Sequence, residues 1–268
     1  MSVANRVVVV GLGEVGRPIL DLVAKQHDAI GVDLSPPPER LSTVDTLHIC
    51  YPFGIDDFVA ESARYIELFK PSLTIINSTV AVGTTRAIAR KTGGAVVHSP
   101  VRGKHAHMTE DLRRYVKFVG GVKRSDSESA ADHFRSMGIT TTVLSSPEAT
   151  ELAKLSETTY FGLMIAWAQE LERYCDQLGQ NYEEIVSFYK EIGVFPPVTY
   201  VPGVIGGHCV MPNISILLRL GPSAMLQAIQ SSNEQKIERD AGQAIGPVRS
   251  DDTRPEETRS AGGLALSS

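Results

Sequence analysis

The sequence predicts an α/β protein in which a doubly wound sheet is followed by a smaller, all-helical domain built on one long helix. Through the first half of the chain, short β-branched apolar runs alternate with amphipathic segments. This alternation is typical of a parallel sheet that is covered by helices on both faces. Near residue 146 the apolar residues begin to recur every three or four positions, which indicates helix.

The first domain, residues 1–145, is expected to contain buried strands wherever a short run is almost continuously apolar. These runs are Arg6–Val10, Ala29–Val32, Thr46–Cys50, Leu73–Asn77, Ala95–His98, Val116–Val119 and Thr140–Leu144. Segments with one apolar face lie between several of them, among them Arg17–Gln26 and Phe58–Phe69, and we expect these to form covering helices. The alternation predicts that the strands run parallel.

The second domain is expected to begin with a long helix over Ser146–Leu178. Ser146 is a suitable N-cap, Pro147 fits the first turn, and Glu148 lies at the positive end of the helix dipole. One apolar face is predicted from the residues that recur along the helix, namely Leu152, Leu155, Leu163, Trp167, Leu171, Tyr174 and Leu178.

Shorter helices are predicted to follow over Tyr182–Glu191, Ile214–Leu220 and Ala224–Glu238. Residues 146–240 are therefore expected to form a helical domain for substrate binding and dimerisation, and residues 241–268 a disordered tail. Aromatic residues widen the apolar surface of the long helix beyond one stripe, and such a helix needs a second partner to bury it. We therefore expect a homodimer packed through this helix, at Tyr160, Phe161 and Trp167.

Composition excludes several classes of protein. Apolar residues make up 42% of the 268 residues and the net charge is −5, which is ordinary for a globular protein and unfavourable for binding a phosphate backbone. The apolar runs are too short to cross a bilayer, and the first residues do not resemble a signal peptide. Three cysteines at unrelated spacings fit neither a disulfide framework nor a zinc site. We expect a cytoplasmic protein that binds neither nucleic acid nor membrane.

A glycine-rich loop follows the first strand, which runs into Gly11-Leu12-Gly13-Glu14-Val15-Gly16 and then into a predicted helix. In a dinucleotide-binding loop these glycines allow a tight turn, a close approach to a pyrophosphate, and close packing of helix on strand. Asp33 ends the next strand, where a carboxylate would bind a ribose 2′-hydroxyl and repel a 2′-phosphate. We expect a Rossmann-like domain that binds NAD through Gly11, Gly13, Glu14, Val15, Gly16 and Asp33. A glycine turn followed by a chance acidic residue is the alternative.

Polar residues follow other predicted strands, at the edge of the sheet where ligands of doubly wound folds bind. Candidates for cofactor contacts at this edge are Tyr51, Pro52 and Thr79. The hydroxyl groups around Thr79 could equally cap the helix that follows.

The segment after the fifth strand is basic, with Arg102, Lys104, His105 and His107 close together. It is either a solvated loop or, if it lies over the cleft, a segment suited to an anionic substrate. Histidines two residues apart without a set of carboxylates are a weak sign of a metal site, and no metal is expected.

Two further segments carry reactive side chains. Lys154 and Thr158 lie four residues apart on the predicted long helix, and Cys209 follows Gly206, Gly207 and His208. A thiol after two glycines is placed where a substrate can approach the backbone, and an adjacent histidine or a nearby lysine could lower its pKa. A buried cysteine and a surface lysine are the alternatives.

Over residues 5–220 the chain resembles the UDP-glucose/GDP-mannose dehydrogenase family. The order and spacing of several motifs agree, namely Gly11–Gly16, Asn77–Val80 with Gly83-Thr84, Ser99-Pro100, Val119–Gly121, Glu151–Leu155, Ala168–Glu170 and Pro202–Cys209. The resemblance implies oxidation of a sugar primary alcohol to a carboxylate in two NAD-dependent steps. It also implies that Cys209 carries the covalent adduct, that Lys154 stabilises the oxyanion, and that Thr79 orders water.

The chain departs from the family pattern at several positions. Thr158 replaces an Asn, Asn213 replaces an Asp, and Pro100-Val101 replaces a Pro-Glu pair, while His105 falls near a catalytic Glu of some members. An Asn cannot act as a base. Because only residues 210–268 follow Cys209, we expect a short member without the C-terminal domain that binds the nucleotide sugar.

The leading interpretation is an NAD-dependent dehydrogenase that oxidises a primary alcohol or aldehyde, sugar-like or nucleotide-sugar-like, through a covalent adduct on Cys209. The residues expected at the reacting centre are Cys209, Lys154, Thr79, Thr158, Asn213 and His105. A β-hydroxyacid-type dehydrogenase, with Lys154 as acid and base and no covalent step, is a second hypothesis. A degenerate relative that binds NAD without catalysis is a third.

Overall fold

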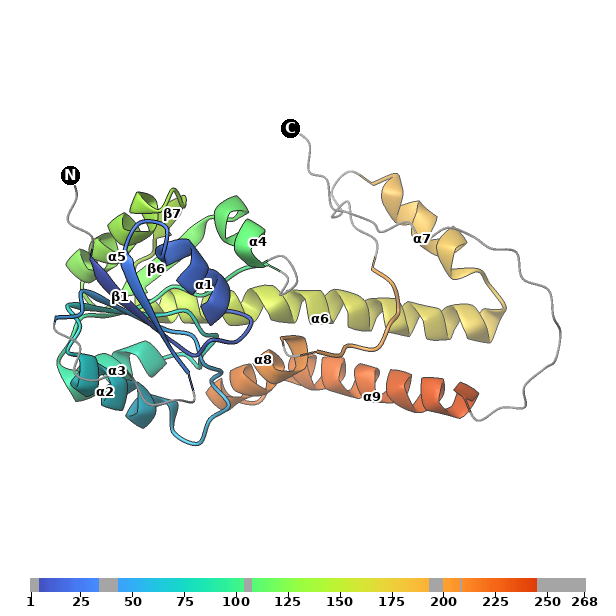
Figure 1. The fold of residues 1–268 in the computed structure, drawn as a ribbon. Coiled ribbons are helices and arrows are strands. Elements are labelled where there is room, and N and C mark those ends of the chain that lie inside the picture. Colours follow the sequence, from blue (N-terminus) through green and yellow to red (C-terminus); the bar gives the residue numbers. More distant parts are fainter. Residues whose placement is uncertain (1–4, 34–42, 104–107, 193–199, 208, 245–268) are drawn as a thin grey trace.

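The computed structural model describes residues 5–33, 43–103, 108–192, 200–207 and 209–244. In these ranges one sheet has the strand order β2-β1-β3-β4-β5-β6-β7 (Figure 1). The strands are β1 (Arg6–Val10), β2 (Asp28–Val32), β3 (Thr46–Ile49), β4 (Leu73–Ile76), β5 (Val96–His98), β6 (Lys117–Gly121) and β7 (Thr141–Val143). The predicted α/β fold class with a Rossmann-like sheet is confirmed.

The sheet is mixed, although the alternating pattern predicts parallel strands. β5 and β6 pair antiparallel, with Val97 opposite Gly121 and His98 opposite Gly120. The neighbouring pairs on both sides, β4 with β5 and β6 with β7, are parallel. β6 begins at the edge where β5 ends, so the connection between them stays at one edge of the sheet. The prediction of strand direction is therefore wrong for this one pair.

Helices cover both faces of the sheet (Figure 1). One face packs on α1 (Gly16–Val23), α4 (Met108–Arg114) and α5 (Arg124–Ser136), and the other on α2 (Phe58–Phe69) and α3 (Thr84–Thr92). Val7 and Val9 of β1 belong to the first core, and Val8 and Val10 to the second. This two-sided burial is the physical reason why β1 is a continuous apolar run.

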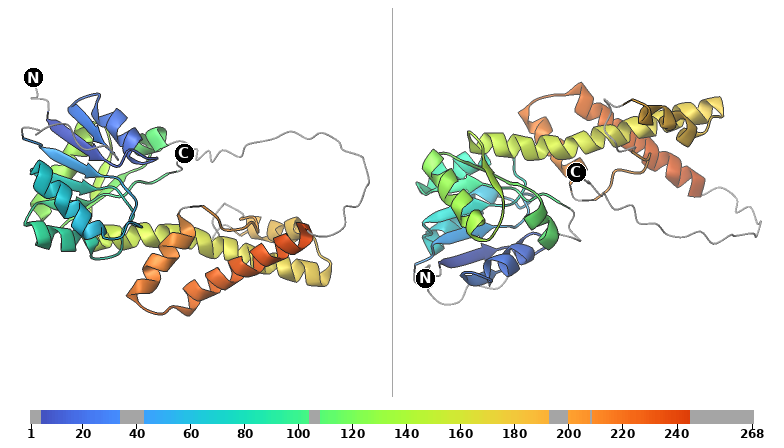
Figure 2. Two further views of the ribbon diagram at one scale, coloured as in Figure 1. Left: turned by 60° about the horizontal axis from the view of Figure 1, so that its bottom comes forward. Right: turned by 90° about the horizontal axis from the view of Figure 1, so that it is seen from above.

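The helical domain begins with α6 (Pro147–Leu178), which extends away from the sheet, and α9 (Ala224–Ala244) lies beside it (Figure 2). The side chain of Ser146 accepts a hydrogen bond from the backbone N–H of Ala149 at 3.2 Å, as predicted for an N-cap. The remaining elements are α7 (Tyr182–Lys190), α8 (Val210–Leu217) and the 3₁₀ turn η2 (Leu218–Leu220). The predicted tail lies outside the described residues from 245 onward, and α9 includes residues 241–244.

The buried face of α6 is not the predicted apolar stripe. Leu152, Trp167, Tyr174 and Leu178 of that stripe are exposed, and among its members only Leu155 is fully buried. The face that packs against α8 and α9 instead carries mostly small or polar residues among its fully buried positions, namely Thr158, Gly162, Ala166 and Gln169. A Cβ on Gly162 would lie 2.6 Å from Val210 Cγ1, so the two helices approach too closely for bulky side chains. The predicted face is corrected accordingly.

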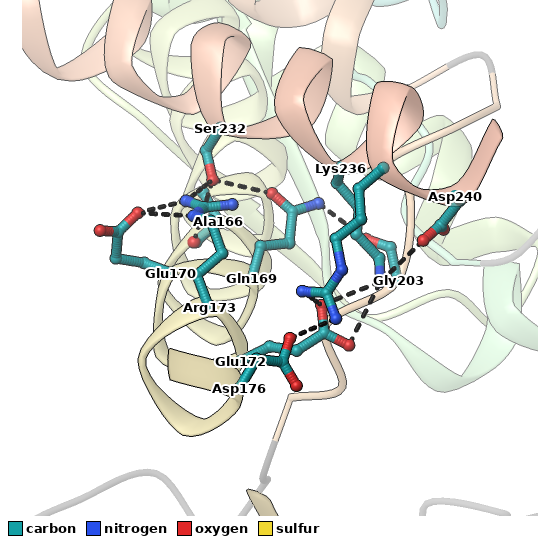
Figure 3. Close-up of polar contacts among 11 residues, drawn as sticks. Ala166, Gln169, Glu170, Glu172, Arg173, Asp176, Gly203, Ser232, Lys236 and Asp240 are labelled. Carbon is teal, nitrogen blue, oxygen red and sulfur yellow. Dashed lines mark hydrogen bonds and ion pairs between the residues drawn. The ribbon is translucent and has the colours of Figure 1, made fainter. Parts of the chain in front are cut away.

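A network of polar side chains joins α6 to α9 (Figure 3). The hydroxyl of Ser232 on α9 donates to Gln169 Oε1 at 3.0 Å and accepts from Arg173 Nη2 at 3.0 Å. Farther along the helices, Lys236 Nζ lies 2.9 Å from a carboxylate oxygen of Glu172. The polar residues on these facing surfaces form hydrogen bonds and ion pairs with one another, so they can be buried without unsatisfied polar groups. Among the described residues, no helix is both long enough and apolar enough to cross a membrane.

Candidate functional site

The glycine-rich loop between β1 and α1 has the shape that the sequence predicts. Gly11 has a φ of 87°, and a Cβ there would lie 2.6 Å from the backbone N of Tyr51. A Cβ on Gly16 would lie 1.7 Å from the carbonyl oxygen of Gly11. A Cβ on Gly13 would meet no atom within 4 Å, so open space lies beside this glycine. Packing therefore requires the first and third glycines, whereas the second leaves room for a ligand.

The other predicted cofactor residues surround this loop. Asp33 is exposed at the end of β2, and one of its carboxylate oxygens accepts a hydrogen bond from the N–H of Leu12 at 3.4 Å. Val15, the N-cap residue of α1, makes no side-chain cap, so the positive end of the helix dipole lies beside the loop without a capping side chain. Tyr51 is half-buried after β3, and its carbonyl oxygen accepts from the Ser78 hydroxyl at 2.6 Å. Pro52 is exposed beside it. This set fits a dinucleotide.

His98, which sequence reasoning did not select, ties the strand edge to α6. Its Nε2 lies 3.1 Å from the Ser78 carbonyl oxygen, and its Nδ1 lies 2.8 Å from Thr150 Oγ1. Burial lowers the pKa of His98 to about 3, so the ring is neutral and carries one N–H. The carbonyl needs a donor, so Nε2 carries the proton and Nδ1 accepts from Thr150. His98 thereby links the turn that holds Thr79 to Thr150, which lies one helical turn before Lys154 on α6.

Glu151 settles the question of what caps α3. Its two carboxylate oxygens accept hydrogen bonds from Gly83 N at 2.6 Å and from Thr85 N at 2.9 Å, and the side chain is fully buried. The N-cap residue Gly83 has no side chain to do this. The hydroxyl-rich turn around half-buried Thr79 is therefore not needed for capping at that helix end.

A second cluster gathers four of the predicted catalytic residues where α6 meets α8. Asn213 Nδ2 donates to Thr158 Oγ1 at 2.7 Å, and Thr158 Oγ1 donates back to a carbonyl oxygen of its own helix, 3.2 Å from that of Lys154. The backbone N–H of Asn213 donates to the carbonyl oxygen of Cys209 at 3.1 Å. Two of the positions where the chain departs from the family pattern, Thr158 and Asn213, thus contact each other directly.

Lys154 is largely buried in this cluster, and its side chain is 13% exposed. Burial lowers the pKa of its ammonium, while the nearby carboxylate of Glu157 and the thiol of Cys209 raise it. Cys209 itself is exposed at the start of α8. An amine and a thiol within electrostatic reach of each other are groups that can act on one carbonyl.

The backbone just before Cys209 is held by two buried amide side chains. Asn233 on α9 accepts from the N–H of Ile205 at 2.7 Å and donates to its carbonyl oxygen at 3.1 Å. Gln169 on α6 donates to the carbonyl oxygen of Gly203 at 2.8 Å (Figure 3). No local sequence signal identifies these two residues, because each contact joins positions at least 28 apart. His105 and His208 lie outside the described residues.

A cavity of about 240 Å³ opens beside Lys154. It is lined by Pro100, Arg102, Phe118, Leu144, Thr150, Ala153, Lys154 and Glu157. Arg102 is ion-paired with Glu157, so this member of the basic segment is not a freely solvated charge. Lys104 and His107 lie outside the described residues. In the part of the chain that is described, no group of three or more His, Cys, Asp or Glu could hold a metal ion.

Beneath the strand edge lies a buried lysine that the sequence pattern did not reveal. Lys117 Nζ donates to the carbonyl oxygen of Ser99 at 2.5 Å and to Asn77 Oδ1 at 3.2 Å. Burial lowers its pKa to about 7. Its position under the turns that carry Thr79 and Pro100 makes it a structural support for both.

Residues 148–235 match the sequence profile described as UDP-glucose/GDP-mannose dehydrogenase family, central domain. This segment of the chain, which spans α6 to α9, is therefore similar to the central domain of that family. Among curated relatives of this family, UDP-N-acetyl-D-mannosamine dehydrogenase of Methanocaldococcus jannaschii is 26% identical over 78% of the chain. NDP-N-acetyl-D-galactosaminuronic acid dehydrogenase of Ralstonia nicotianae is 23% identical over 85% of the chain. The chain spans 60% of the length of the first relative and 68% of the second.

Solved structures have the same fold. A UDP-D-ManNAc dehydrogenase from Pyrococcus horikoshii has a TM-score of 0.79 and 22% identity, over 88% of this chain and 70% of that one. A 3-hydroxyisobutyrate dehydrogenase from Mycobacterium tuberculosis has a TM-score of 0.67 and 16% identity, over 89% of this chain and 94% of that one. Nucleotide-sugar and β-hydroxyacid dehydrogenases therefore share this architecture, and the fold alone does not choose between them.

Proposed function

We propose that this chain is an NAD-dependent dehydrogenase that oxidises the primary alcohol of a nucleotide sugar or a similar small molecule. The observation that carries the proposal is that Cys209 lies within electrostatic reach of the buried Lys154, in a chain whose first loop has dinucleotide-type geometry. The curated relatives, named as dehydrogenases of UDP-N-acetyl-D-mannosamine and of a related NDP-sugar, support the substrate class. Since NAD and nucleotide sugars are cytoplasmic metabolites, the proposal places the protein in the cytoplasm.

The residues around the glycine loop would hold the cofactor. The backbone of the glycine loop, at the positive end of the α1 dipole, would bind the pyrophosphate in the space beside Gly13. Asp33 would accept hydrogen bonds from the ribose hydroxyls and would repel the 2′-phosphate of NADP. Thr79, Tyr51 and Pro52 would border the inner end of the site. When bound, NAD supplies a two-electron oxidant that takes a hydride from the substrate carbon.

Lys154 and Cys209 would share the chemistry on the substrate. In the first oxidation Lys154 would stabilise the negative charge that develops on the alcohol oxygen as its proton leaves. The thiolate of Cys209 would then add to the aldehyde carbon and form a hemithioacetal. A second two-electron oxidation would leave the acyl group on Cys209 as a thioester, and one water would release the carboxylate and regenerate the thiol.

The Thr158–Asn213 pair would limit the rate at which water hydrolyses the thioester. Neither an amide nor a hydroxyl bound to it is a base that can take a proton from the attacking water at neutral pH. We therefore expect deacylation to be slow and an acyl adduct to accumulate on Cys209. His105, near the position of a catalytic Glu in some family members, stays a candidate for assisting water.

The test follows NADH formation from UDP-N-acetyl-D-mannosamine and UDP-glucose, together with the intact mass of the protein. Lys154→Ala should abolish both oxidations, whereas Cys209→Ser should abolish only oxidation to the carboxylate and leave the aldehyde as product. Wild-type protein quenched during turnover should carry an acyl adduct that Cys209→Ala protein lacks. Full oxidation to the acid by Cys209→Ser would contradict the covalent step and favour the β-hydroxyacid mechanism, in which Lys154 alone acts as acid and base.

The exposed aromatic residues of α6 support a homodimer. Tyr160, Phe161, Trp167 and Tyr174 are each between 45% and 48% exposed. Large exposed aromatic groups on one long helix are typical of an interface, because aromatic side chains supply much of the energy of association. Light scattering at micromolar concentration should give twice the mass of the chain, and Trp167→Glu should give the monomer. A wild-type monomer would contradict this part of the proposal.

A further inference from the structure

Arg102, which follows β5 directly, makes an asymmetric ion pair with Glu157 on α6. Its Nε and Nη2 both donate to the same oxygen, Glu157 Oε1, at 3.0 and 2.6 Å. The guanidinium is also held over two rings, with its carbon 5.4 Å from the ring centre of Tyr115 and 5.5 Å from that of Phe118. Arg102 therefore has a fixed place and engages only one of the two oxygens of the carboxylate.

The other oxygen of Glu157 faces Lys154. Glu157 Oε2 lies 3.9 Å from Lys154 Nζ, three residues earlier on the same face of α6. Arg102, Glu157 and Lys154 all line the cavity beside the cluster of Lys154 and Cys209. One oxygen of the Glu157 carboxylate therefore binds Arg102, and the other faces Lys154. Lys154 is the residue that stabilises the oxyanion in the proposed function.

We propose that Arg102 and Glu157 are positioning residues that set the charge and the place of the Lys154 amine. This inference deepens the proposed function and rests on it, because it gives the segment after β5 a direct effect on the reacting centre. Glu157 favours the protonated amine, and Arg102 limits that effect by neutralising most of the carboxylate. The ion pair of Arg102 and Glu157 therefore links the cavity that Arg102 lines to the charge of the Lys154 amine.

Among the described residues, the charged groups around Lys154 affect its pKa in the directions that this division requires. Burial is the largest influence on the Lys154 pKa and lowers it, Glu157 and Cys209 raise it, and Arg102 lowers it. From the sheet side, the buried His98 and Lys117 each feel the charge of Lys154, and His98 is neutral. Without Arg102, Glu157 would be a full counter-ion and Lys154 would keep its proton more firmly. The lysine to which the proposed function assigns the oxyanion stabilises it as the charged ammonium, so Glu157 and Arg102 together set how much of that form is present at a given pH.

A second glutamate of α6, Glu148, also pairs with an arginine, but it binds that arginine through both carboxylate oxygens. Arg86 on α3 binds Glu148 with its Nε on one oxygen at 2.5 Å and its Nη2 on the other at 2.9 Å. Both pairs are about one-third exposed. Because the Arg86 fork occupies both oxygens, Glu148 makes a two-point ion pair with one partner. It is a matched control for the pair that is shared with Lys154.

The experiment measures the acid–base state of Lys154 without any substrate. Full-length protein is acetylated with trace acetic anhydride across a pH series, and peptide mass spectrometry gives the labelling rate of Lys154. Glu157→Gln should lower the Lys154 pKa and speed its labelling at fixed pH by about threefold or more. Arg102→Gln should raise the pKa and slow the labelling. Arg102→Lys, which keeps the charge, should restore part of the wild-type rate.

The controls separate this inference from a purely structural role and from the proposed function. Glu148→Gln and Arg86→Gln should leave the Lys154 titration unchanged, and thermal melts should show that all four Gln variants are folded. Shifts in the same direction for Glu157→Gln and Arg102→Gln, or no shift beyond that of the controls, would overturn the inference. Opposite shifts in a protein that reduces no NAD with any nucleotide sugar would keep the inference and reject the proposed function.

Discussion

The two halves of α6 differ in how they use buried polar side chains. In the first half, Glu151 and Thr158 bind other elements, while Lys154 and Glu157 line a cavity. In the second half, the polar residues of α6 and α9 bind one another, and bulky apolar residues face outward (Figure 3). In both halves most of the fully buried residues are small or polar, although Leu155 is also fully buried and Leu163 and Ile165 pack against α8 and α9. The comparison shows that close helix packing, rather than the apolar period, decides which side of this helix is buried.

The largest effect is expected from an overpacking substitution at the middle of α6, where the helix packs on α8. Gly162→Leu would force a side chain against Val210 and Ile214, and the free energy of unfolding should fall by about 3 kcal/mol. Leu178→Ala, at a residue 72% exposed, should change it by less than about 0.5 kcal/mol. Urea denaturation measures both. A larger loss in Leu178→Ala would mean that the apolar stripe is the packed face after all.

In the first half, the fully buried Glu151 should matter more than its neighbour one turn away. Glu151→Ala leaves the N–H groups of Gly83 and Thr85 without acceptors and should cost about 2 kcal/mol. Glu148→Ala removes a partly exposed ion pair and should cost less than about 1 kcal/mol. Equal losses in thermal or urea unfolding would show that Glu151 does not hold the turn that follows β4.

A smaller effect is expected where the second half holds the segment before Cys209. Asn233→Ala removes both hydrogen bonds to Ile205 and should cost about 1 kcal/mol. The Ile205 amide should then exchange with deuterium at least tenfold faster, as measured by mass spectrometry. Gln235→Ala, at an exposed position on the same helix, is the matched control. Unchanged exchange at Ile205 would contradict the role of Asn233.

The smallest effects are opposite slopes of stability with pH. Burial lowers the Lys154 pKa, so the folded state loses its proton first, and stability rises as pH increases from the folded value toward the unfolded one. Glu172 and Asp240 raise the Lys236 pKa above its ordinary value despite its burial, so that stabilisation is complete below the unfolded pKa and is lost as pH rises through the folded one. Lys154→Met and Lys236→Met should therefore change the slope between pH 7 and 11 in opposite directions. Parallel changes in urea denaturation would contradict the comparison.

The strands could be predicted because a strand buried on both faces, such as β1, is a continuous run of apolar residues. The antiparallel direction of β6 could not, because its short apolar run resembles those of its parallel neighbours. The apolar period of α6 gave its length correctly and its buried face wrongly, since bulky residues are kept out where Gly162 meets Val210. Within the site, Lys154 and Cys209 stand in recognisable segments, whereas Glu157 and His98 act through partners more than 50 residues away.

The open space beside Gly13 has a consequence for mutational tolerance. Substitutions at Gly11 and Gly16 collide with backbone, so any screen for folded protein would reject them. Alanine at Gly13 collides with nothing, so the same screen would pass it, and only a screen for nucleotide-dependent growth or binding would notice the change. The positions that fail an activity scan but pass an abundance scan would therefore outline the site of the proposed cofactor, and Gly13 is the first position expected among them.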